Sequence, residues 1–275
     1  MIIAIAGASG FVGRALTVKL CANNHDVVAL HRSAKGPVAS EWTVVVDLRD
    51  EMATVRALKN VDAAYYLVHS MASGDEFRDL DLQLATAFGR AASRAGVGRI
   101  IYVGALGDAP SSEHLSSRHE VGVALRSSGV DVVELRAAVV FGAGSISFEM
   151  LRYLTERLPA MVCPRWVRTR IQPIALCDLL SYLEQSLHVA PGVYEIGGAD
   201  VTTYRDMISA YARVRGLRRR FILDIPWLTP HLSSYWVDLV TPVDRSVSHA
   251  LIESLVTEVI VVHGERTQQA FPSCR

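Results

Sequence analysis

The sequence predicts an α/β protein built on a doubly wound parallel sheet, with a small C-terminal lobe beside it. Short runs of Val, Ile and Ala alternate with segments of helical periodicity over the first 140 residues. Within these runs the apolar residues are continuous rather than alternating, which is typical of strands buried on both faces. A chain of 275 residues is long enough for one such sheet and an appended lobe.

The elements follow one another in a regular order. Strands are expected at 2–7, 27–30, 43–48, 62–68, 99–106 and 130–140. Helices are expected from Phe11 to Leu20, from Met52 to Leu58, from Phe77 to Ala95, and around Leu125. Strands separated in this way by helices indicate right-handed crossovers within a single parallel sheet.

The pattern loosens after about residue 145. The run YEIGG at 194–198 is expected to be one more strand of the sheet, whereas 164–173 and 226–242 carry Pro and Trp and fit a smaller lobe on the ligand side. We therefore expect a core over residues 1–200 and a lobe over 201–275, packed as one compact unit.

Composition narrows the classes of function. Lys plus Arg and Asp plus Glu both number 28, so no net charge favours nucleic acid or an anionic membrane. The four cysteines form no C-x-x-C pair, and His114 and His119 face different sides of a helix, so we expect neither a disulfide framework nor a metal site. The first residues show no signal peptide, and no apolar run is long enough for a membrane span. These features favour a cytoplasmic protein.

A glycine-rich turn follows the first strand. Residues 7–13 read GASGFVG, which is G-x-x-G-x-x-G between an expected strand and an expected helix. Glycines at such a turn let the backbone approach a pyrophosphate, and the helix N-terminus offers free N–H groups to the anion. The context of strand, turn and helix makes this motif a prediction of dinucleotide binding.

The end of the second strand bears on which dinucleotide binds. An acidic residue there would hold the ribose hydroxyls of NAD, but this chain has His31, Arg32, Ser33 and Lys35. A guanidinium suits a 2′-phosphate, so NADP(H) is favoured over NAD(H). Asp47, after the third strand, could bind the adenine amino group or could cap the helix that follows.

These motifs resemble the short-chain dehydrogenase/reductase superfamily. The segments GASGFVG, YYLVHSM, RIIYVGALG, ELRAAVVFGAGS and QPIALCDL are similar to its atypical branch, which includes NmrA-like proteins and the nucleotide-binding accessory subunit of respiratory complex I. The resemblance implies a Rossmann-type fold that binds NAD(P). The cofactor contacts expected from motif and resemblance together are Gly7, Ala8, Ser9, Gly10, Phe11, Val12, Gly13, His31, Arg32, Ser33, Lys35, Asp47, Leu48, Val68, His69, Ser70, Val103, Gly104, Ala105, Val140 and Phe141.

The same resemblance shows that the usual catalytic groups are changed. The family uses a Ser or Thr after the fifth strand, a Tyr, and a Lys four residues beyond the Tyr. This chain has Val103-Gly104-Ala105 at the strand end, with His114 in place of the Tyr and Arg118 in place of the Lys. Asp81 stands where many members carry a polar Asn. His114 could replace the Tyr as general acid, whereas Arg118 could hold an anion but cannot cycle as a base. The alternative is that His114 is an ordinary exposed loop histidine and Arg118 a surface helix residue.

Two functions remain open from the sequence. One is an NADPH-dependent oxidoreductase that reduces a small carbonyl or quinone-like substrate, with His114 or a bound water supplying the proton. The other is a non-catalytic NADP(H)-binding redox sensor or structural partner of another protein. Arg165, Arg168 and Arg170 with Trp166 could form a wall that accepts an anion or a quinone, or simply a solvated basic segment.

Overall fold

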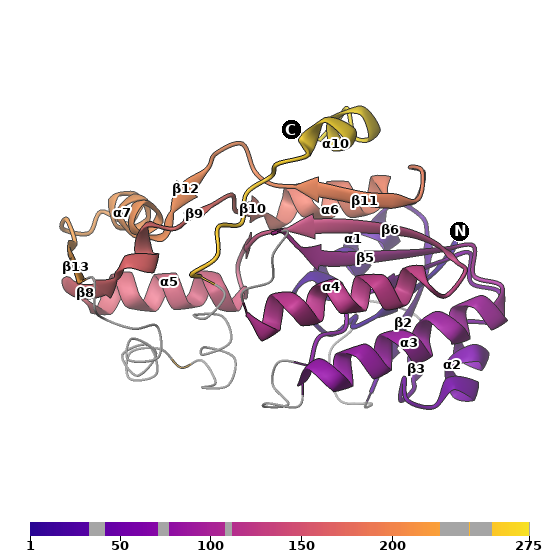
Figure 1. The fold of residues 1–275 in the computed structure, drawn as a ribbon. Helices are drawn as coiled ribbons and strands as arrows, with labels where there is room; N and C mark the ends of the chain where they lie inside the picture. The colour runs from indigo at the N-terminus through magenta and orange to yellow at the C-terminus, as the bar shows by residue number, and fades with distance from the viewer. Residues whose placement is uncertain (33–41, 71–76, 108–111, 226–241, 243–254, 275) are drawn as a thin grey trace.

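Seven strands form one parallel sheet in the computed structural model, which describes residues 1–32, 42–70, 77–107, 112–225, 242 and 255–274 (Figure 1). The strand order is β11-β6-β5-β4-β1-β2-β3. Because β2 and β4 lie on opposite sides of β1, the direction of winding reverses between β1 and β4, and ligands of such folds bind beyond the carboxyl ends of the strands at this point. The strands span β1 Ile2–Ala6, β2 Asp26–His31, β3 Trp42–Val45, β4 Ala63–Tyr66, β5 Arg99–Ala105, β6 Asp131–Ala137 and β11 Gly192–Ile196.

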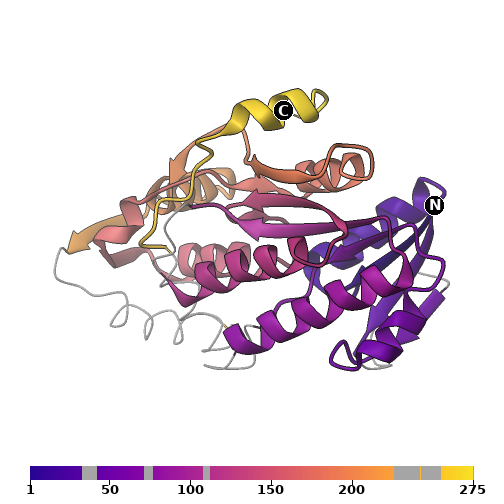
Figure 2. The same cartoon turned by 45° about the vertical axis from the view of Figure 1, so that its right-hand side comes forward.

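Helices cover both faces of the sheet, as Figures 1 and 2 show. On one face lie α1 (Phe11–Ala22) and α6 (Leu176–Gln185). On the other lie α2 (Glu51–Ala57), α3 (Phe77–Ala95) and α4 (Glu113–Arg126). Within the described ranges, no helix is both long and apolar enough to span a membrane.

Each face of the sheet has its own apolar cluster. Ile3 and Ile5 of β1 are fully buried on the side of α1 and α6, whereas Ala4 and Ala6 face α3 and α4. Successive side chains of a strand point to opposite faces, so a strand buried on both sides must be apolar throughout. The continuous apolar runs of the sequence are explained by these two clusters.

The predicted doubly wound sheet is confirmed, with changes at the ends of some elements. The run expected as one strand at 130–140 is interrupted: β6 ends at Ala137, and Val140–Phe141 form β7. This short strand leaves the main sheet and pairs with β10 (Ile174–Ala175). The strand expected at 194–198 is observed two residues earlier, as β11, which pairs with β6 in parallel.

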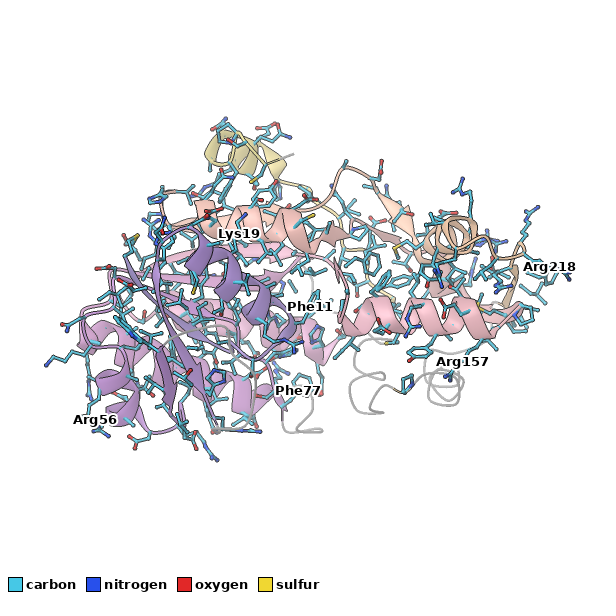
Figure 3. The ribbon with its side chains drawn as sticks, turned by 180° about the vertical axis from the view of Figure 1, so that it is seen from behind. Phe11, Lys19, Arg56, Phe77, Arg157 and Arg218 are labelled. Carbon is cyan, nitrogen blue, oxygen red and sulfur yellow. The ribbon has the colours of Figure 1, made fainter. Side chains whose placement is uncertain are left out.

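A second group of elements packs at one end of the sheet, around its own apolar cluster of Leu151, Met161, Met207, Ile208 and Ile222. In Figure 3 its outer end is marked by Arg157 and Arg218, far from Arg56 at the opposite end of the molecule. Most of segment 226–242 lies outside the described residues. The elements are α5 (Ile146–Arg157), β8 (Ala160–Pro164), η2 (Arg165–Arg168), β9 (Arg170–Ile171), β12 (Thr202–Thr203), α7 (Tyr204–Val214) and β13 (Phe221–Ile225).

The last residues return from this group to the main sheet. Helix α10 (Gly264–Ala270) packs against β11, and Phe271 is buried with its ring 5.1 Å from that of Tyr182 and 5.3 Å from that of Tyr194. The chain beyond residue 200 therefore contributes to two apolar clusters: the one between the sheet and helices α1 and α6, and the one within the second group of elements. The expected boundary at residue 200 stays a prediction.

A buried carboxylate connects α4 to the sheet. Glu134 on β6 is 1% exposed and forms ion pairs with Arg126 of α4 and with Arg136, whose Nε lies 2.8 Å from the carboxylate. Gly104 and Gly122 make room for it, because a Cβ on either residue would lie within 3.0 Å of the Glu134 oxygens. This ionic cluster fixes the helix that carries His114 and Arg118.

Candidate functional site

Two cavities open at the carboxyl edge of the sheet. One of about 390 Å³ lies over the ends of β2 and β3, and one of about 500 Å³ lies over the ends of β5 and β6 and extends toward α5 and α7. Gly7, Gly10, Leu67 and His69 line both, so the cavities meet at the turn between β1 and α1. A dinucleotide that crosses the switch point of such a sheet requires this kind of two-part cleft.

The glycine turn has the geometry of a pyrophosphate site. Gly7 has φ of +89°, and a Cβ there would lie 2.7 Å from the Leu67 carbonyl oxygen, so a side chain is excluded. Gly13 packs on the Gly7 carbonyl with equally little space. A Cβ on Gly10 would instead contact only the Gly7 oxygen, at 3.2 Å, and Gly10 faces both cavities as the N-cap of α1. The N–H groups of the first turn of this helix point along its axis and suit an anion.

Two arginines lie at the smaller cavity. Arg32 follows β2, and Arg49 follows β3 and binds the Asp47 carboxylate through its guanidinium, with the Arg49 Nε 3.0 Å from Oδ2. Hydrogen bonds from Arg49 lower the pKa of Asp47. The alternative role of Asp47 as a helix cap is wrong, because Asp50 caps α2 by accepting from the Ala53 N–H. His31 is buried at the same cavity, and within the described residues its Nε2 has no hydrogen-bond partner.

Three side chains from separate elements form a hydrogen-bonded chain at the larger cavity. Asp81 of α3 is almost fully buried, and its Oδ2 lies 2.7 Å from Nδ1 of His69, which follows β4. Nε2 of His69 lies 3.3 Å from Nδ1 of His114, in the first turn of α4. The Ser70 N–H donates to Oδ1 of Asp81, and the Ser117 hydroxyl donates to Oδ2. His69 and His114 both line the cavity.

The surroundings of this hydrogen-bonded chain keep His69 and His114 neutral. Burial, aided by the nearby His69 and Arg118, lowers the pKa of His114 to about 3. Burial also lowers the pKa of His69, although the hydrogen bond to Asp81 opposes the effect. Burial alone would raise the pKa of Asp81, but its bonds from His69 and Ser70 outweigh that and lower it. At neutral pH the site therefore contains one carboxylate and two uncharged imidazoles.

Arg118 is held in place by β5. Its guanidinium donates to the Val103 carbonyl and stacks over the Tyr102 ring, 5.0 Å from the centroid. The Tyr102 hydroxyl in turn donates to the Arg118 carbonyl at 2.9 Å. Arg118 lines the larger cavity one helical turn from His114, so it places a fixed positive charge there.

The structure brings most of the predicted contacts to the two cavities, except for two that lie elsewhere and two that lie outside the described residues. Ala8 is fully buried beneath the turn, and Phe141 lines a separate groove between α5 and α7. Ser33 and Lys35 are in the undescribed range. The predicted residues that line the cavities are Gly7, Ser9, Gly10, Phe11, Val12, Gly13, His31, Arg32, Asp47, Leu48, Val68, His69, Ser70, Val103, Gly104, Ala105, His114, Arg118 and Val140. Phe11, labelled in Figure 3, lies where α1 begins.

Of the expected arginine wall, only Arg170 is among the residues that line the larger cavity. Arg168 pairs instead with Asp224, and Trp166 packs against the Tyr204 ring. Arg170 is itself paired with Glu258, with its Nη2 2.9 Å from Oε2. Arg168, Arg170 and Trp166 are therefore engaged within the protein rather than open to a ligand.

Several cavity residues were not expected from the sequence. Arg49 lies two positions after Asp47, and a search for basic residues at every strand end would have found it. Tyr204 and Thr257 reach the larger cavity from α7 and from the segment before α10. That segment is held to β9 because the Val259 N–H donates to the Arg170 carbonyl at 3.3 Å. No local motif marks such residues, since only the tertiary fold brings them to the cleft.

The low pKa of His114 predicts a stability that depends on pH. The unfolded chain takes up this proton near the ordinary value of 6.5, whereas the native protein takes it up only near 3. Stability is therefore lost as the pH falls below 6.5, by up to about 2 kcal/mol between pH 6.5 and 5. Urea unfolding of the wild type and of His114→Gln at several pH values measures this, and the variant should lose less stability in acid. His263→Gln is the control, because it removes an imidazole that is exposed rather than buried. If the free energy of unfolding depends on pH equally in all three proteins, the prediction is wrong.

Comparison with known proteins bears on the glycine turn and on the fold. Residues 7–140 match the model of a family described as NAD(P)H-binding. Uncharacterized proteins of Mycobacterium tuberculosis and Mycobacterium bovis are each 26% identical to this chain over 170 residues, which is 61% of the chain. The matched region spans only 18% of the length of these relatives.

Solved structures agree with the fold over nearly the whole chain. The enzyme WbmH of Bordetella bronchiseptica, in complex with NAD+, has a TM-score of 0.74 and 16% identity, covering 99% of this chain and 92% of its own. UDP-glucose 4-epimerase of Thermotoga maritima, with UDP-glucose, has a TM-score of 0.68 and 14% identity, covering 93% and 97%. DesIV, a dTDP-glucose 4,6-dehydratase of Streptomyces venezuelae, has a TM-score of 0.68 and 18% identity, covering 82% and 84%.

Proposed function

We propose that this chain belongs to the short-chain dehydrogenase/reductase superfamily and is an NADP(H)-dependent oxidoreductase of a small molecule. The match of residues 7–140 to an NAD(P)H-binding family and the Rossmann-type fold support this proposal. The proposed reaction interconverts a hydroxyl and a carbonyl, or the two states of a quinone-like compound. The chain of Asp81, His69 and His114, beside the glycine turn, carries this proposal. A buried carboxylate that holds imidazoles at a cavity is typical of a proton-transfer site. The finer placement among NmrA-like proteins remains a prediction.

The chain's own residues have separate roles in this proposal. The turn at Gly7–Gly13 and the N-terminus of α1 hold the pyrophosphate, and the bound nicotinamide supplies hydride transfer. His114 exchanges a proton with the substrate oxygen through its ring nitrogen Nε2. Arg118 cannot exchange protons at neutral pH, and its fixed charge, held by the Val103 carbonyl, attracts an electron-rich group of the substrate.

Arg32 and Arg49 support a preference for the phosphorylated cofactor. Both line the cavity expected to hold the adenosine half, and Asp47, the acidic residue there, is neutralised by its bonds to Arg49. A 2′-phosphate would gain charge-assisted hydrogen bonds from such guanidinium groups, whereas a ribose hydroxyl would find no unpaired carboxylate among these residues. The structural neighbours WbmH and DesIV have NAD bound, so this preference belongs to the proposal for this chain alone.

Calorimetric titration with NADPH, NADP⁺, NADH and NAD⁺ tests this proposal. The phosphorylated pair should bind at least about tenfold more tightly, because one charge-assisted hydrogen bond contributes about 1.5 to 3 kcal/mol. Arg32→Ala should remove this difference. Arg49→Ala should reduce it and strengthen NAD(H) binding, since it frees the Asp47 carboxylate. Arg56→Ala, on the outer side of α2, is the matched control and should change nothing. Equal binding of all four nucleotides would contradict the NADP preference, and binding of none would contradict the function.

A non-catalytic redox sensor is the second candidate. The absence of a hydroxyl at Val103-Gly104-Ala105 favours it, because the group that usually orients the substrate oxygen is missing. A sensor should bind the oxidised and reduced cofactors with clearly different affinities, since that difference is the coupling energy it can pass to a partner. It should also oxidise no NADPH in the presence of carbonyl compounds or quinones. The same titration, followed by a substrate screen, therefore separates the two candidates.

A further inference from the structure

The hydrogen-bonded chain at the larger cavity fixes where each proton lies. Asp81 is ionised and can only accept, so Nδ1 of His69 must carry a proton and donate it at 2.7 Å. A neutral His69 then has a lone pair on Nε2, which accepts from Nδ1 of His114 at 3.3 Å. This leaves Nε2 of His114 without a proton and, among the described residues, without a hydrogen-bond partner. Each step follows from the one before it, beginning at the carboxylate.

From this chain we propose that His69 and Asp81 are positioning residues that present His114 to the cleft as a proton acceptor, so that the preferred substrate is an alcohol and the preferred direction is oxidation. The role of His114 as a base rests on the proposed function, whereas its tautomer follows from the hydrogen bonds alone. In the forward step the substrate O–H bond breaks and its proton passes to Nε2 of His114. The C–H bond breaks with its electron pair, which leaves as hydride to oxidised NAD(P)⁺, and a C=O bond forms.

The groups packed around His114 determine the protonation state from which the reaction starts. His69, from the loop after β4, accepts the Nδ1 proton in both states of His114. Asp81, from α3, stabilises the positive charge that His114 gains, acting through His69. Arg118, from α4, and the positive end of that helix oppose the charge before substrate arrives, so the ring starts neutral. Reduction would require His114 to be protonated first, and burial, His69 and Arg118 oppose that protonation.

One isosteric substitution should reverse the direction of both hydrogen bonds between Asp81, His69 and His114. In Asp81→Asn the amide oxygen is held at the Oδ1 position, because the Ser70 N–H donates to that atom at 2.8 Å. The NH₂ group then occupies the Oδ2 position and donates to Nδ1 of His69. His69 must now carry its proton on Nε2 and donate to Nδ1 of His114. Nε2 of His114 becomes protonated and can no longer accept.

Nitrogen-detected NMR of the ¹⁵N-labelled protein, free of nucleotide and at pH 7.5, measures these tautomers directly. We expect Nδ1–H on His114 in the wild type and Nε2–H in Asp81→Asn. Ser117→Ala is the matched control, because it removes the other partner of Oδ2 at 3.2 Å without changing what His69 can donate to. Nε2–H in the wild type, or an unchanged tautomer in Asp81→Asn, would overturn the proposal.

Kinetics with NADP⁺ and a panel of small secondary alcohols then test the use of the proton. The kcat of Asp81→Asn should fall at least about tenfold relative to Ser117→Ala, since correct protonation is what general-base catalysis requires. His69→Gln should lower kcat with little change in KM, because His69 acts through His114. If the tautomer changes as expected but kcat does not, His114 is not the base. A failure to bind any nucleotide would count against the proposed function, while the NMR result would still decide the tautomer.

Discussion

Replacing Glu134 with glutamine is expected to lower the free energy of unfolding by about 3 kcal/mol. The carboxylate is 1% exposed and lies between Arg126 and Arg136, whose side chains are 32% and 19% exposed. Removal of one partner of a buried ionic cluster leaves the others with an uncompensated desolvation cost. The loss of stability should lie at the lower end of the range of about 3 to 5 kcal/mol that is usual for breaking a buried ion pair, because the two arginines keep partial contact with water.

Urea denaturation followed by circular dichroism measures this effect. Glu184→Gln is the matched control, because Glu184 also pairs with a cation, Lys19, at 3.1 Å, but is 31% exposed. A half-exposed pair of this kind contributes about 1 kcal/mol, so the two variants should separate clearly. Equal effects would show that the ionic cluster around Glu134 is no more important than a surface pair. Since Arg126 belongs to α4, Glu134→Gln should also loosen the helix that carries His114.

The framework of the fold could be predicted from the sequence because its signals are local. Each strand of the first half is a continuous apolar run, and β1, β2 and β4 are buried on both faces in the structure, whereas the edge strand β3 is largely exposed. The glycine turn at Gly7 and Gly13 was equally readable, since backbone conformation and close packing exclude side chains at these positions. Where the prediction was imprecise, as at the end of β6, the chain leaves the sheet to pair with a segment more than 30 residues away.

The chemistry of the site could be predicted only in part. The sequence identified His114, Arg118, His69 and Asp81 as separate positions, but their hydrogen bonds join residues 12 and 45 positions apart. Such pairings depend on how α3 and α4 pack together. Gly104 shows the same limit, because its lack of a hydroxyl reads as a missing catalytic group, whereas a side chain there would point at the buried Glu134.

Gly10→Ala is expected to weaken nucleotide binding by about 100-fold or more while the protein stays folded. A Cβ at Gly10 would contact the protein only at the Gly7 oxygen, 3.2 Å away, and φ of −72° suits any residue. The methyl group would extend into the cleft, where the pyrophosphate must approach the N–H groups of α1. Loss of two charge-assisted hydrogen bonds costs about 3 to 6 kcal/mol, which corresponds to roughly 100-fold or more in affinity.

Gly98→Ala is the control for adding a methyl group to a glycine that lies close to a backbone carbonyl oxygen. Its Cβ would lie 3.3 Å from the Asp62 oxygen, and its N–H donates to that same carbonyl, as the N–H of Gly10 does to Gly7. Both variants should therefore have nearly the same melting temperature, and only Gly10→Ala should lose binding in calorimetric titration with NADPH. Normal binding by Gly10→Ala would mean that no pyrophosphate lies against this turn. The two cavities would then need a different ligand, even though the sheet beneath them is that of a dinucleotide-binding fold.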